Sequence, residues 1–412
     1  MGAAVIEKHI TIDRGMEGND HKVSLLPDEF AQMMQGIRRV EESMGQGGER
    51  SISQGEMMNR EVLAKSLVSA CDVPAGTEIT EAMVRIQSPG QGLQPNRLKD
   101  LIGRRLPVAK SQGEVFFPSD LETPAATPRR YQFNQPFGLP VRYHDIKVFS
   151  EVSNLDLVEI HLSYKDLEVD LNQVLPVRQN IGLVIHAPEL FAGDHTLDLC
   201  TEDSSYRNHS IAELQRVIDI SRDLRNRFQC SDPVLLVTNV GGFSEHHHLN
   251  RSERKPLRER LITSLKKINT AGEVEIIPQT MPPFPWHFGG QRFHNLFVDT
   301  DFIRQFCEEQ DMRVCLDVSH SKLACNHLHI PFRQFLDQIL PFTAHLHLAD
   351  AKDVDGEGLQ ILDGDIDWVQ LFEQIDQHCP KASFIPEIWQ GHKNGGEAAW
   401  LALERLEAAA RA

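Results

Sequence analysis

Carboxylate and imidazole side chains recur in the second half of the sequence at the ends of short apolar segments. Asp317 closes one such segment, His347 lies in the next and Glu387 ends the last. A single histidine there is more often satisfied by a hydrogen bond, and Asp317 alone could cap a helix. Three separate segments that each carry a ligand type favour a divalent cation, with Mn, Mg, Co or Zn all allowed. We predict that Gln279, Asp317, His347 and Glu387 are its ligands.

The elements that must position these residues alternate between strand-like and helical segments over residues 131–412. This length and rhythm are typical of the α/β class and of an eight-stranded (β/α)8 TIM barrel. The predicted strands are Gly138–Tyr143, Leu157–Leu162, Gly182–His186, Val234–Thr238, Val274–Ile277, Arg313–Leu316, Ala344–Leu348 and Ser383–Pro386. Helices are predicted between them, including Ser210–Phe228, Pro256–Ile268, Phe302–Gln310 and Asp367–Gln377.

The active site of such a barrel lies at the C-terminal ends of its strands, so polar residues there gain functional weight. The second strand ends in Glu159 and His161 and the third in His186, while Asn239 and Asp350 follow the fourth and seventh. His320 lies three residues beyond Asp317. We predict catalytic roles for Glu387, Glu159, His186 and His320. The run His246–His248 follows a strand end in a polar loop and is interpreted as a solvated turn.

The composition limits the class of partner. The chain has 59 acidic and 42 basic residues and a net charge of -17, which would repel a nucleic-acid backbone. Its 7 cysteines include no C-x-x-C pair, which is typical of free thiols in a reducing compartment and indicates a cytoplasmic protein. No apolar run is long enough to span a membrane. We therefore expect a small-molecule ligand, with neither nucleic acid nor membrane as partner.

The first 130 residues are organised differently from the barrel. Residues 1–44 are predicted to form a strand at 3–6, a loop and an amphipathic helix, because Phe30, Met33, Ile37, Val40 and Met44 recur at helical spacing. A Gly/Ser/Gln-rich linker follows at 45–60. Residues 61–121 form a small, mostly β module with Pro/Gly turns, and 122–130 form a second linker.

Six motifs give the second half a family resemblance: VEIHLS (158–163), VIHAP (184–188), DVSHSKL (317–323), HLHLADA (345–351), DGEG (355–358) and PEIWQG (386–391). With them, residues 131–412 resemble the xylose isomerase-like barrel superfamily of sugar isomerases, epimerases, inosose-pathway enzymes and abasic-site endonucleases. The resemblance implies cation ligands at Asp317, His347 and Glu387, and places His320 close to substrate or metal. It also implies a fifth-strand ligand, usually glutamate.

The sequence departs from this pattern at three positions. Gln279 and Thr280 stand where the family has Glu and Asn, and Asn239 stands where the nuclease branch has His. A glutamine carbonyl can coordinate a hard cation but cannot accept a proton as a base. The departures argue against DNA repair and against two-base epimerisation. One-base isomerisation of a sugar or sugar phosphate through Glu387, Glu159 or a histidine stays open, as does loss of catalysis.

The N-terminal segments resemble the sialic acid synthases, which condense phosphoenolpyruvate with an amino sugar. The stretch IEKHITIDRGMEGNDHKVSLLPDEF (6–30) is similar to the last strand, loop and helix of their barrel, which implies a metal-ligand role for His9. DVPAGTEIT (72–80), SPGQGLQP (88–95) and LIGRRLPVAKSQGEVF (101–116) are similar to their antifreeze-like (SAF) domain, which implies a possible homodimer. That domain normally lends a partner an arginine just before its PG turn, where this chain has Ser88.

Two hypotheses follow for the whole chain. In the first, a metal-dependent isomerase or epimerase-like barrel is joined to the C-terminal part of a sialic (nonulosonic) acid synthase and acts in carbohydrate biosynthesis. In the second, the barrel is a non-catalytic sugar-binding module that assembles with a synthase. Synthase activity is not expected from this chain alone, because the earlier barrel strands of a synthase are not in it. The chain is interpreted as a fragment of a longer fusion or as a protein that starts at Met1.

Overall fold

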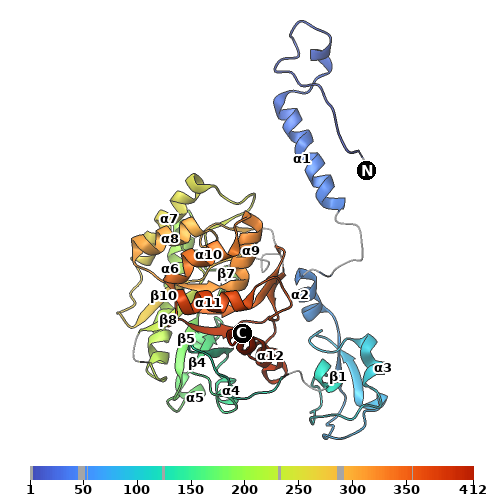
Figure 1. Ribbon diagram of the computed structural model, residues 1–412, viewed down its shortest axis with the longest axis vertical. Coiled ribbons are helices and arrows are strands. Elements are labelled where there is room, and N and C mark those ends of the chain that lie inside the picture. The colour runs from blue at the N-terminus through green and yellow to red at the C-terminus, as the bar shows by residue number, and fades with distance from the viewer. Residues whose placement is uncertain are drawn as a thin grey trace. The chain divides into compact units, whose positions relative to one another are not determined.

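The computed structural model describes residues 3–44, 52, 54–122, 126–230, 233–284, 292–354 and 356–412. The chain divides into two compact units, Met1–Ile52 and Ser53–Ala412 (Figure 1). Residues 45–51 and 53 of the predicted linker 45–60, and 123–125 of the linker 122–130, lie outside the described residues.

The first unit is built around one long helix. It contains the 3-10 helix η1 (Asp20–Val23) and the helix α1 (Pro27–Met44), which confirms the helix predicted from apolar spacing. The Glu29 side chain accepts the Leu26 amide at 2.8 Å and pairs with Arg14, so it caps the helix start. The strand predicted at 3–6 is absent, because these residues lie exposed with no neighbouring strand in the described part of this unit to complete a ladder.

The small domain, defined here as residues 54–122, begins the second unit. Its elements are α2 (Gln54–Leu63), β1 (Ser66–Ser69), η2 (Glu81–Met83), β2 (Val84–Gln87), η3 (Pro95–Arg97), α3 (Leu98–Leu101) and η4 (Pro118–Asp120). Residues 54–60, predicted as linker, thus form the first turns of α2. The strands β1 and β2 pair antiparallel, and further single bridges tie the turns together. The domain has its own apolar core, which contains Leu67, Val73, Ile79, Leu93, Leu101, Leu106, Phe116 and Leu121.

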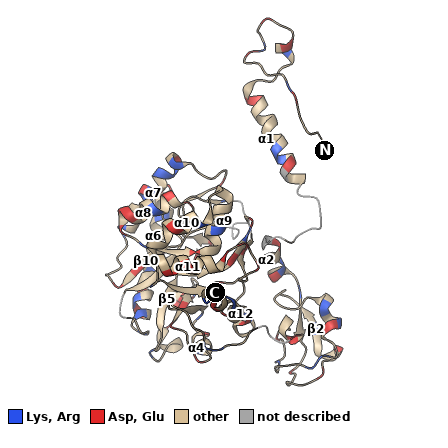
Figure 2. Cartoon of the chain, in the orientation of Figure 1, with Lys and Arg blue, Asp and Glu red and all other residues tan. Residues whose placement is uncertain are grey.

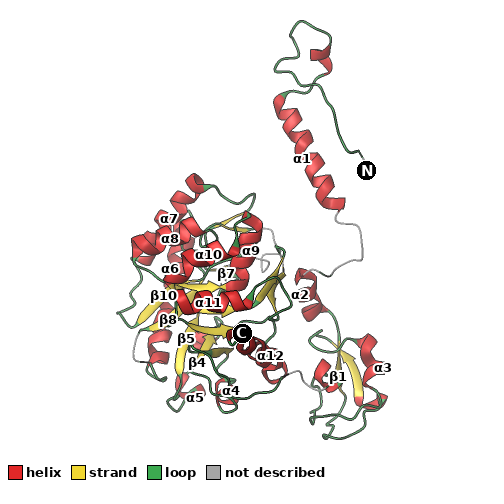
Figure 3. Ribbon diagram, viewed as in Figure 1, coloured by secondary structure: helices red, strands yellow, loops and turns green. Residues whose placement is uncertain are grey.

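Parallel strands lie at the centre of the larger part of the second unit, residues 126–412 (Figure 3). They are β3 (Gly138–Val141), β4 (Leu157–His161), β5 (Gly182–His186), β8 (Val234–Thr238), β10 (Val274–Pro278), β12 (Val314–Asp317), β13 (Thr343–Leu348) and β16 (Ser383–Pro386). Hydrogen-bonded neighbours follow the orders β10-β8-β5-β4-β3 and β12-β13-β16. Single parallel bridges, Phe137 to Phe384 and Gln279 to Cys315, join the two groups at both edges. The strands therefore close, and the predicted α/β TIM barrel is confirmed.

Helices connect the strands and cover the outside of the barrel (Figure 1). They are α4 (Ile146–Ser150), η5 (Asp166–Glu168), α5 (Leu171–Val174), α6 (Ser204–Arg225), α7 (Arg251–Leu265), α8 (Thr300–Gln310), α9 (Val318–Leu328), α10 (Phe332–Ile339), η7 (Leu340–Phe342), α11 (Trp368–His378) and α12 (Lys393–Ala410). Short antiparallel strand pairs extend some strand ends: β6 (Leu190–Phe191) with β7 (His195–Thr196), β9 (Phe243–Ser244) with β11 (Phe293–His294), and β14 (Asp350–Lys352) with β15 (Gly356–Leu359).

The barrel interior changes from apolar to polar along the strands. Its lower layer is an apolar cluster made of Leu157, Val184, Val237, Ile277, Cys315, Ala344 and Ile385. Because side chains alternate along a strand, residues two and four positions after Leu157 point to the same interior. These are Glu159 and His161, so the polar layers lie toward the C-terminal ends of the strands.

Charged residues are interspersed along the outer helices (Figure 2). Arg304 pairs with Glu308 at 3.0 Å within α8, and Arg216 pairs with Glu213 at 2.9 Å within α6. No helix in the described part of the chain combines the length and apolarity that crossing a bilayer would require.

Trp400 tests the packing of the last helix, α12, against the outside of the barrel. It is 1% exposed, its ring stacks on Tyr131 at a centroid distance of 6.4 Å, and it meets Phe149 edge-on at 5.8 Å. We expect Trp400→Ala to lower the free energy of unfolding by about 3–5 kcal/mol, because it leaves a large cavity. Urea denaturation followed by circular dichroism measures this.

The matched control is Val148→Ala on α4, whose side chain is 57% exposed. It should change the free energy of unfolding by less than about 0.5 kcal/mol. Equal effects of the two variants would contradict the packing described for Trp400.

Candidate functional site

A cavity of about 460 Å³ opens at the C-terminal ends of the barrel strands. The lining includes predicted site residues from five strands or strand ends, namely His161, His186, Gln279, Asp317 and Glu387. It also includes residues that we did not predict, among them Arg142, Glu357, Trp389 and His392. The cavity therefore lies where a TIM barrel carries its active site.

Asp317, His347 and Glu387 come together at this cavity. One ligand atom from each lies within 4.8 Å of the others. Nδ1 of His347 lies 2.6 Å from Oε2 of Glu387 and 3.7 Å from Oδ2 of Asp317. Asp317 also accepts the His320 amide at 2.8 Å and so caps α9. The parallel register that places Asp317 beside His347, and His347 beside Ile385, brings these residues of the three strands together.

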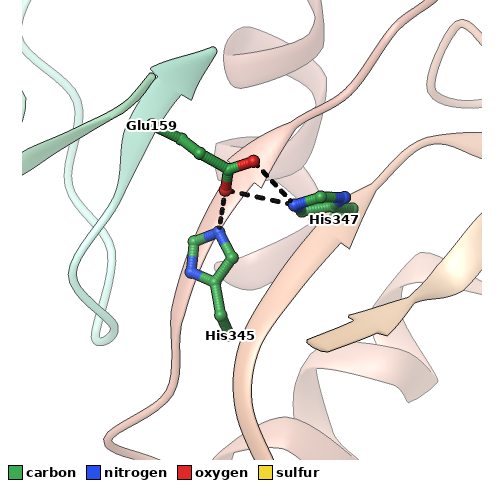
Figure 4. Close-up of side chains that lie close together, drawn as sticks. All are labelled: Glu159, His345 and His347. Atoms are coloured by element: carbon green, nitrogen blue, oxygen red, sulfur yellow. Dashed lines mark hydrogen bonds and ion pairs between the residues drawn. The ribbon is translucent and has the colours of Figure 1, made fainter. Parts of the chain in front are cut away.

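Glu159 holds the other side of the His347 ring (Figure 4). Its carboxylate lies 3.1 Å from Nε2 of His347, 2.7 Å from Nε2 of His345 and 2.9 Å from Nε2 of His161. Nδ1 of His345 in turn lies 2.7 Å from the Ser383 hydroxyl. Glu159 is 0% exposed and does not line the cavity. It contacts His347 from the interior side of the barrel, and we call Asp317, His347 and Glu387 the ligand group.

The pKa values follow from this burial and pairing. Burial disfavours a charge on Glu159, but its imidazole neighbours, His347 foremost, hold the pKa of this carboxyl well below its usual value. Burial likewise opposes ionisation of Glu387, yet His347 lowers its pKa strongly. For His347, burial opposes the charge whereas Glu159 and Glu387 raise the pKa well above the usual range. The ring and its carboxylates therefore stabilise each other as ions.

The donor set fits a divalent cation. Three carboxylates, those of Asp317, Glu159 and Glu387, lie within 3.7 Å of one imidazole, that of His347. His320 lies 3.3 Å from Asp317 and 2.9 Å from Glu357. Two imidazolium rings, those of His347 and His320, therefore face four carboxylates, and buried charges without partners are costly. A cation between Asp317, His347 and Glu387 would replace the proton on Nδ1 and balance more of the charge.

Gln279 adds a neutral donor to this group. Its Nε2 lies 3.1 Å from Oδ2 of Asp317 and 3.2 Å from Nδ1 of His347, and its Oε1 lies 3.2 Å from Nε2 of His186. His186 donates from Nδ1 to the Ala187 carbonyl at 2.8 Å. Burial and His161 lower the pKa of His186, so its ring is neutral and its Nε2 accepts. If the Gln279 carboxamide is rotated by half a turn, its Nε2 donates to Nε2 of His186 and its Oε1 faces Asp317 and His347.

His320 lies beside the ligand group on α9. Its Nδ1 is 3.0 Å from the Thr280 carbonyl oxygen and its Nε2 is 2.9 Å from Oε1 of Glu357 on β15. Burial of this ring opposes its charge, but Asp317 and Glu357 raise the pKa of His320 to about 10. Both N–H groups of the charged ring are thus engaged, so His320 brings a positive charge to the cavity wall and fixes Glu357 there.

Two strand-end residues considered in the sequence serve the fold instead. Asp350 is 0% exposed and accepts the Leu362 amide and the Trp368 indole nitrogen, both at 2.9 Å, so it organises the loop after β15. Asn239 accepts the Gly241 amide at 2.8 Å and shapes the turn after β8. In the run predicted as a solvated turn, His246 and His247 are exposed, but His248 is half-buried and its ring lies 6.3 Å from that of His327.

Sequence reasoning missed His345, Glu357 and Trp389. His345 could have been found, because His345 and His347 are two positions apart on one strand and so point to the same side. Glu357 lies in the DGEG motif, but its contact with His320 depends on how the β14–β15 hairpin folds back. Trp389 lies in the PEIWQG motif, but its place in the cavity wall depends on how the loop after β16 folds.

Comparison with known proteins gives the family. The chain belongs to the xylose isomerase-like TIM barrel family, whose profile matches residues 153–408. Residues 1–49 match the NeuB family and residues 64–122 match the SAF domain, so the resemblances noted in the sequence are confirmed.

The most similar curated relatives include synthases. The chain is 33% identical over 122 residues to N,N'-diacetyllegionaminic acid synthase of Legionella pneumophila, which covers 30% of this chain and 34% of that protein. It is 33% identical over 125 residues to N-acetylneuraminate-9-phosphate synthase of Mus musculus, again covering 30% and 34%. The chain thus spans about a third of the length of these relatives.

Among solved structures, a D-tagatose 3-epimerase-like protein is 16% identical, covers 66% of this chain and 98% of its own, and has a TM-score of 0.47. A 3-keto-D-glucoside 4-epimerase from E. coli is 13% identical, covers 66% of this chain and 99% of its own, and has a TM-score of 0.46.

The contact between Glu159 and His347 gives a prediction about cation affinity. We expect Glu159→Gln to weaken Mn²⁺ binding by about 10–100-fold, because loss of an outer-shell carboxylate disorients and weakens the histidine ligand. Isothermal titration calorimetry on the full chain measures the dissociation constant.

Glu275→Gln is the matched control, because Glu275 lies on β10 of the same barrel and pairs with Arg313 at 2.6 Å away from the cavity. It should bind Mn²⁺ like the parent. Parental affinity in Glu159→Gln as well would contradict the positioning role of Glu159.

Proposed function

We propose that the barrel of this chain binds a divalent cation together with a sugar or sugar phosphate, and that it isomerises or epimerises this ligand. The observation that carries the proposal is that ligand atoms of Asp317, His347 and Glu387 lie within 4.8 Å of one another, beside a cavity that Asp317 and Glu387 line, in a barrel of this family. The donor types and the excess of buried negative charge around His347 support a cation, and the polar lining supports a sugar.

The proposed roles follow from position. Asp317, His347 and Glu387 would hold the cation, with Gln279 as a fourth, neutral donor. When bound there, the cation would polarise the carbonyl group of an open-chain sugar. The Glu387 side chain is 31% exposed, against 5% for Asp317 and 0% for His347, so it is the group of the three that can reach a sugar carbon. It would take the proton next to the carbonyl and return it.

The two histidines of the cavity have separate proposed roles. His320 would present its positive charge to a sugar oxygen and would hold Glu357 at the cavity wall. His186 is neutral and would accept one, or would position the Gln279 carboxamide. Glu159, predicted from the sequence as catalytic, is instead proposed as a positioning residue, because it is buried beneath His347 and has no face toward the sugar.

Gln279 decides between the two reaction types. Epimerisation by two bases needs a proton acceptor on each face of the sugar, and a carboxamide cannot serve as one. Isomerisation needs only one base that moves a proton between neighbouring carbons, which Glu387 can do. We therefore favour isomerisation of an aldose and ketose pair.

We further propose that this chemistry belongs to carbohydrate biosynthesis, and the matches of the N-terminal segments support this. The relatives that they match are named as synthases of legionaminic acid and of N-acetylneuraminate 9-phosphate. We propose that the barrel acts on a precursor or derivative of such acidic sugars in the cytoplasm. The small domain is proposed to mediate a homodimer, as in the synthase family.

A second candidate function is a sugar-binding and assembly module without turnover. The glutamine at position 279, together with the match of residues 64–122 to a synthase-associated domain, favours it. The two functions share the cation and the cavity but differ in whether the sugar is converted.

Replacement of a cation ligand tests the site itself. We expect Asp317→Ala to weaken Mn²⁺ binding by more than the roughly 10–100-fold that loss of an outer-shell group costs, because it removes a direct ligand. Calorimetry with Mn²⁺, repeated with Mg²⁺, Co²⁺ and Zn²⁺, measures the effect. Asp301→Ala, an exposed aspartate on α8, is the control and should bind as the parent does. If Asp317→Ala bound every cation as the parent does, the cluster would not be the site.

Position 279 tests whether the site turns over sugar. We expect the parent, loaded with Mn²⁺, to convert members of an aldose and ketose panel, and Gln279→Glu to add epimerisation because it restores a second carboxylate. Proton exchange from solvent D₂O into the sugar, followed by NMR, measures both reactions. A parent that binds a sugar without any proton exchange, and a Gln279→Glu variant that gains none, would favour the binding module.

A further inference from the structure

The loop between β16 and α12 borders two cavities at once. Residues 387–392 line the proposed sugar pocket. Trp389 and Gln390 also line a second cavity of about 420 Å³, together with Lys393 and Asn394. The opposite wall of the second cavity comes from the small domain and includes Glu61, Gly90, Gly92, Phe117 and Pro118. One short loop is thus shared by the sugar pocket and the small domain.

Glu61 of α2 makes the main contact with this loop. One of its carboxylate oxygens forms an ion pair with Nζ of Lys393, and the other accepts a hydrogen bond from Nε2 of Gln390. The side chains of Lys393 and Glu61 are only 15% and 21% exposed. Asn394 adds a hydrogen bond from its Nδ2 to the Ser119 hydroxyl at 2.7 Å. Both oxygens of Glu61 are therefore engaged by the barrel.

Glu61 is itself fixed to the small domain. Its carbonyl oxygen accepts the Gly90 amide at 3.0 Å. A Cβ at Gly90 would lie 2.3 Å from the Arg60 carbonyl oxygen, so the end of α2 and the turn at Gly90 touch closely. Glu61 can therefore transmit the position of the small domain to the loop.

The loop needs such a restraint. Gln390 has φ 59 and Asn394 has φ 50, a left-handed conformation that residues with a side chain keep only where their surroundings hold them. The internal hydrogen bonds of the loop are short-range, from the Gly391 amide to the Ile388 carbonyl at 2.8 Å and from the Lys393 amide to the Gln390 carbonyl at 3.0 Å. At its pocket side the Trp389 amide donates to the Gly358 carbonyl at 2.9 Å.

We propose that Glu61 is a positioning residue through which the small domain holds the β16–α12 loop, and with it the Trp389 and Gln390 wall of the pocket, in place. The small domain would thus take part in forming the ligand site of the barrel. This inference does not depend on which sugar the barrel takes or on whether it converts it.

Hydrogen–deuterium exchange of the full chain, read by mass spectrometry, tests the proposal without a sugar. We expect Glu61→Ala to make exchange about tenfold faster at the amides of Trp389, Gly391 and Lys393, because local opening sets their exchange rates. Peptides from β4 and β5 should exchange as in the parent.

Two further variants make the outcome decisive. Glu81→Ala removes an exposed carboxylate from the same domain and should leave the loop as in the parent. The charge exchange Glu61→Lys with Lys393→Glu should restore slow exchange that Glu61→Lys alone loses. Unchanged loop exchange in Glu61→Ala would overturn the proposal. So would acceleration that spreads to β4 and β5, or acceleration that the charge exchange does not reverse.

Discussion

The site depends on one buried imidazole that is held from both sides. The ring of His347 lies between Glu159 at Nε2 and Glu387 at Nδ1, with Asp317 close by. These four residues come from β4, β12, β13 and the end of β16, so they meet only in a closed barrel. The register matters as much as closure, because a slip of one residue would turn the His347 side chain to the outside of the barrel.

Charge at this depth requires complete pairing. An ion inside a protein loses its hydration, and its partners must compensate for that loss. Glu159 meets this condition with three imidazoles, and the layer below it is apolar. Glu387, in contrast, has access to the cavity. The difference in burial therefore separates the proposed positioning residue, Glu159, from the proposed base, Glu387.

The small domain contacts the barrel through the loop that begins with Glu387. Glu387 begins the loop whose later residues, Gln390 and Lys393, contact Glu61. The SAF domain thereby lies against a wall of the cavity in the xylose isomerase-like barrel. The fusion therefore has a physical consequence, because the position of one domain affects the ligand site of the other.

The sequence by itself determined the eight strands, the helix α1 and the ligand types at Asp317, His347 and Glu387, because apolar runs, helical spacing and strand ends are local patterns. It did not determine which strand-end residues face the cavity. Asp350 turns away because its carboxylate is satisfied by the loop after β15, and Glu159 lies buried outside the cavity lining. The contact of Glu61 with Lys393 joins residues far apart in the chain. Only the tertiary structure decided these points, because burial and long-range contacts arise when the barrel closes.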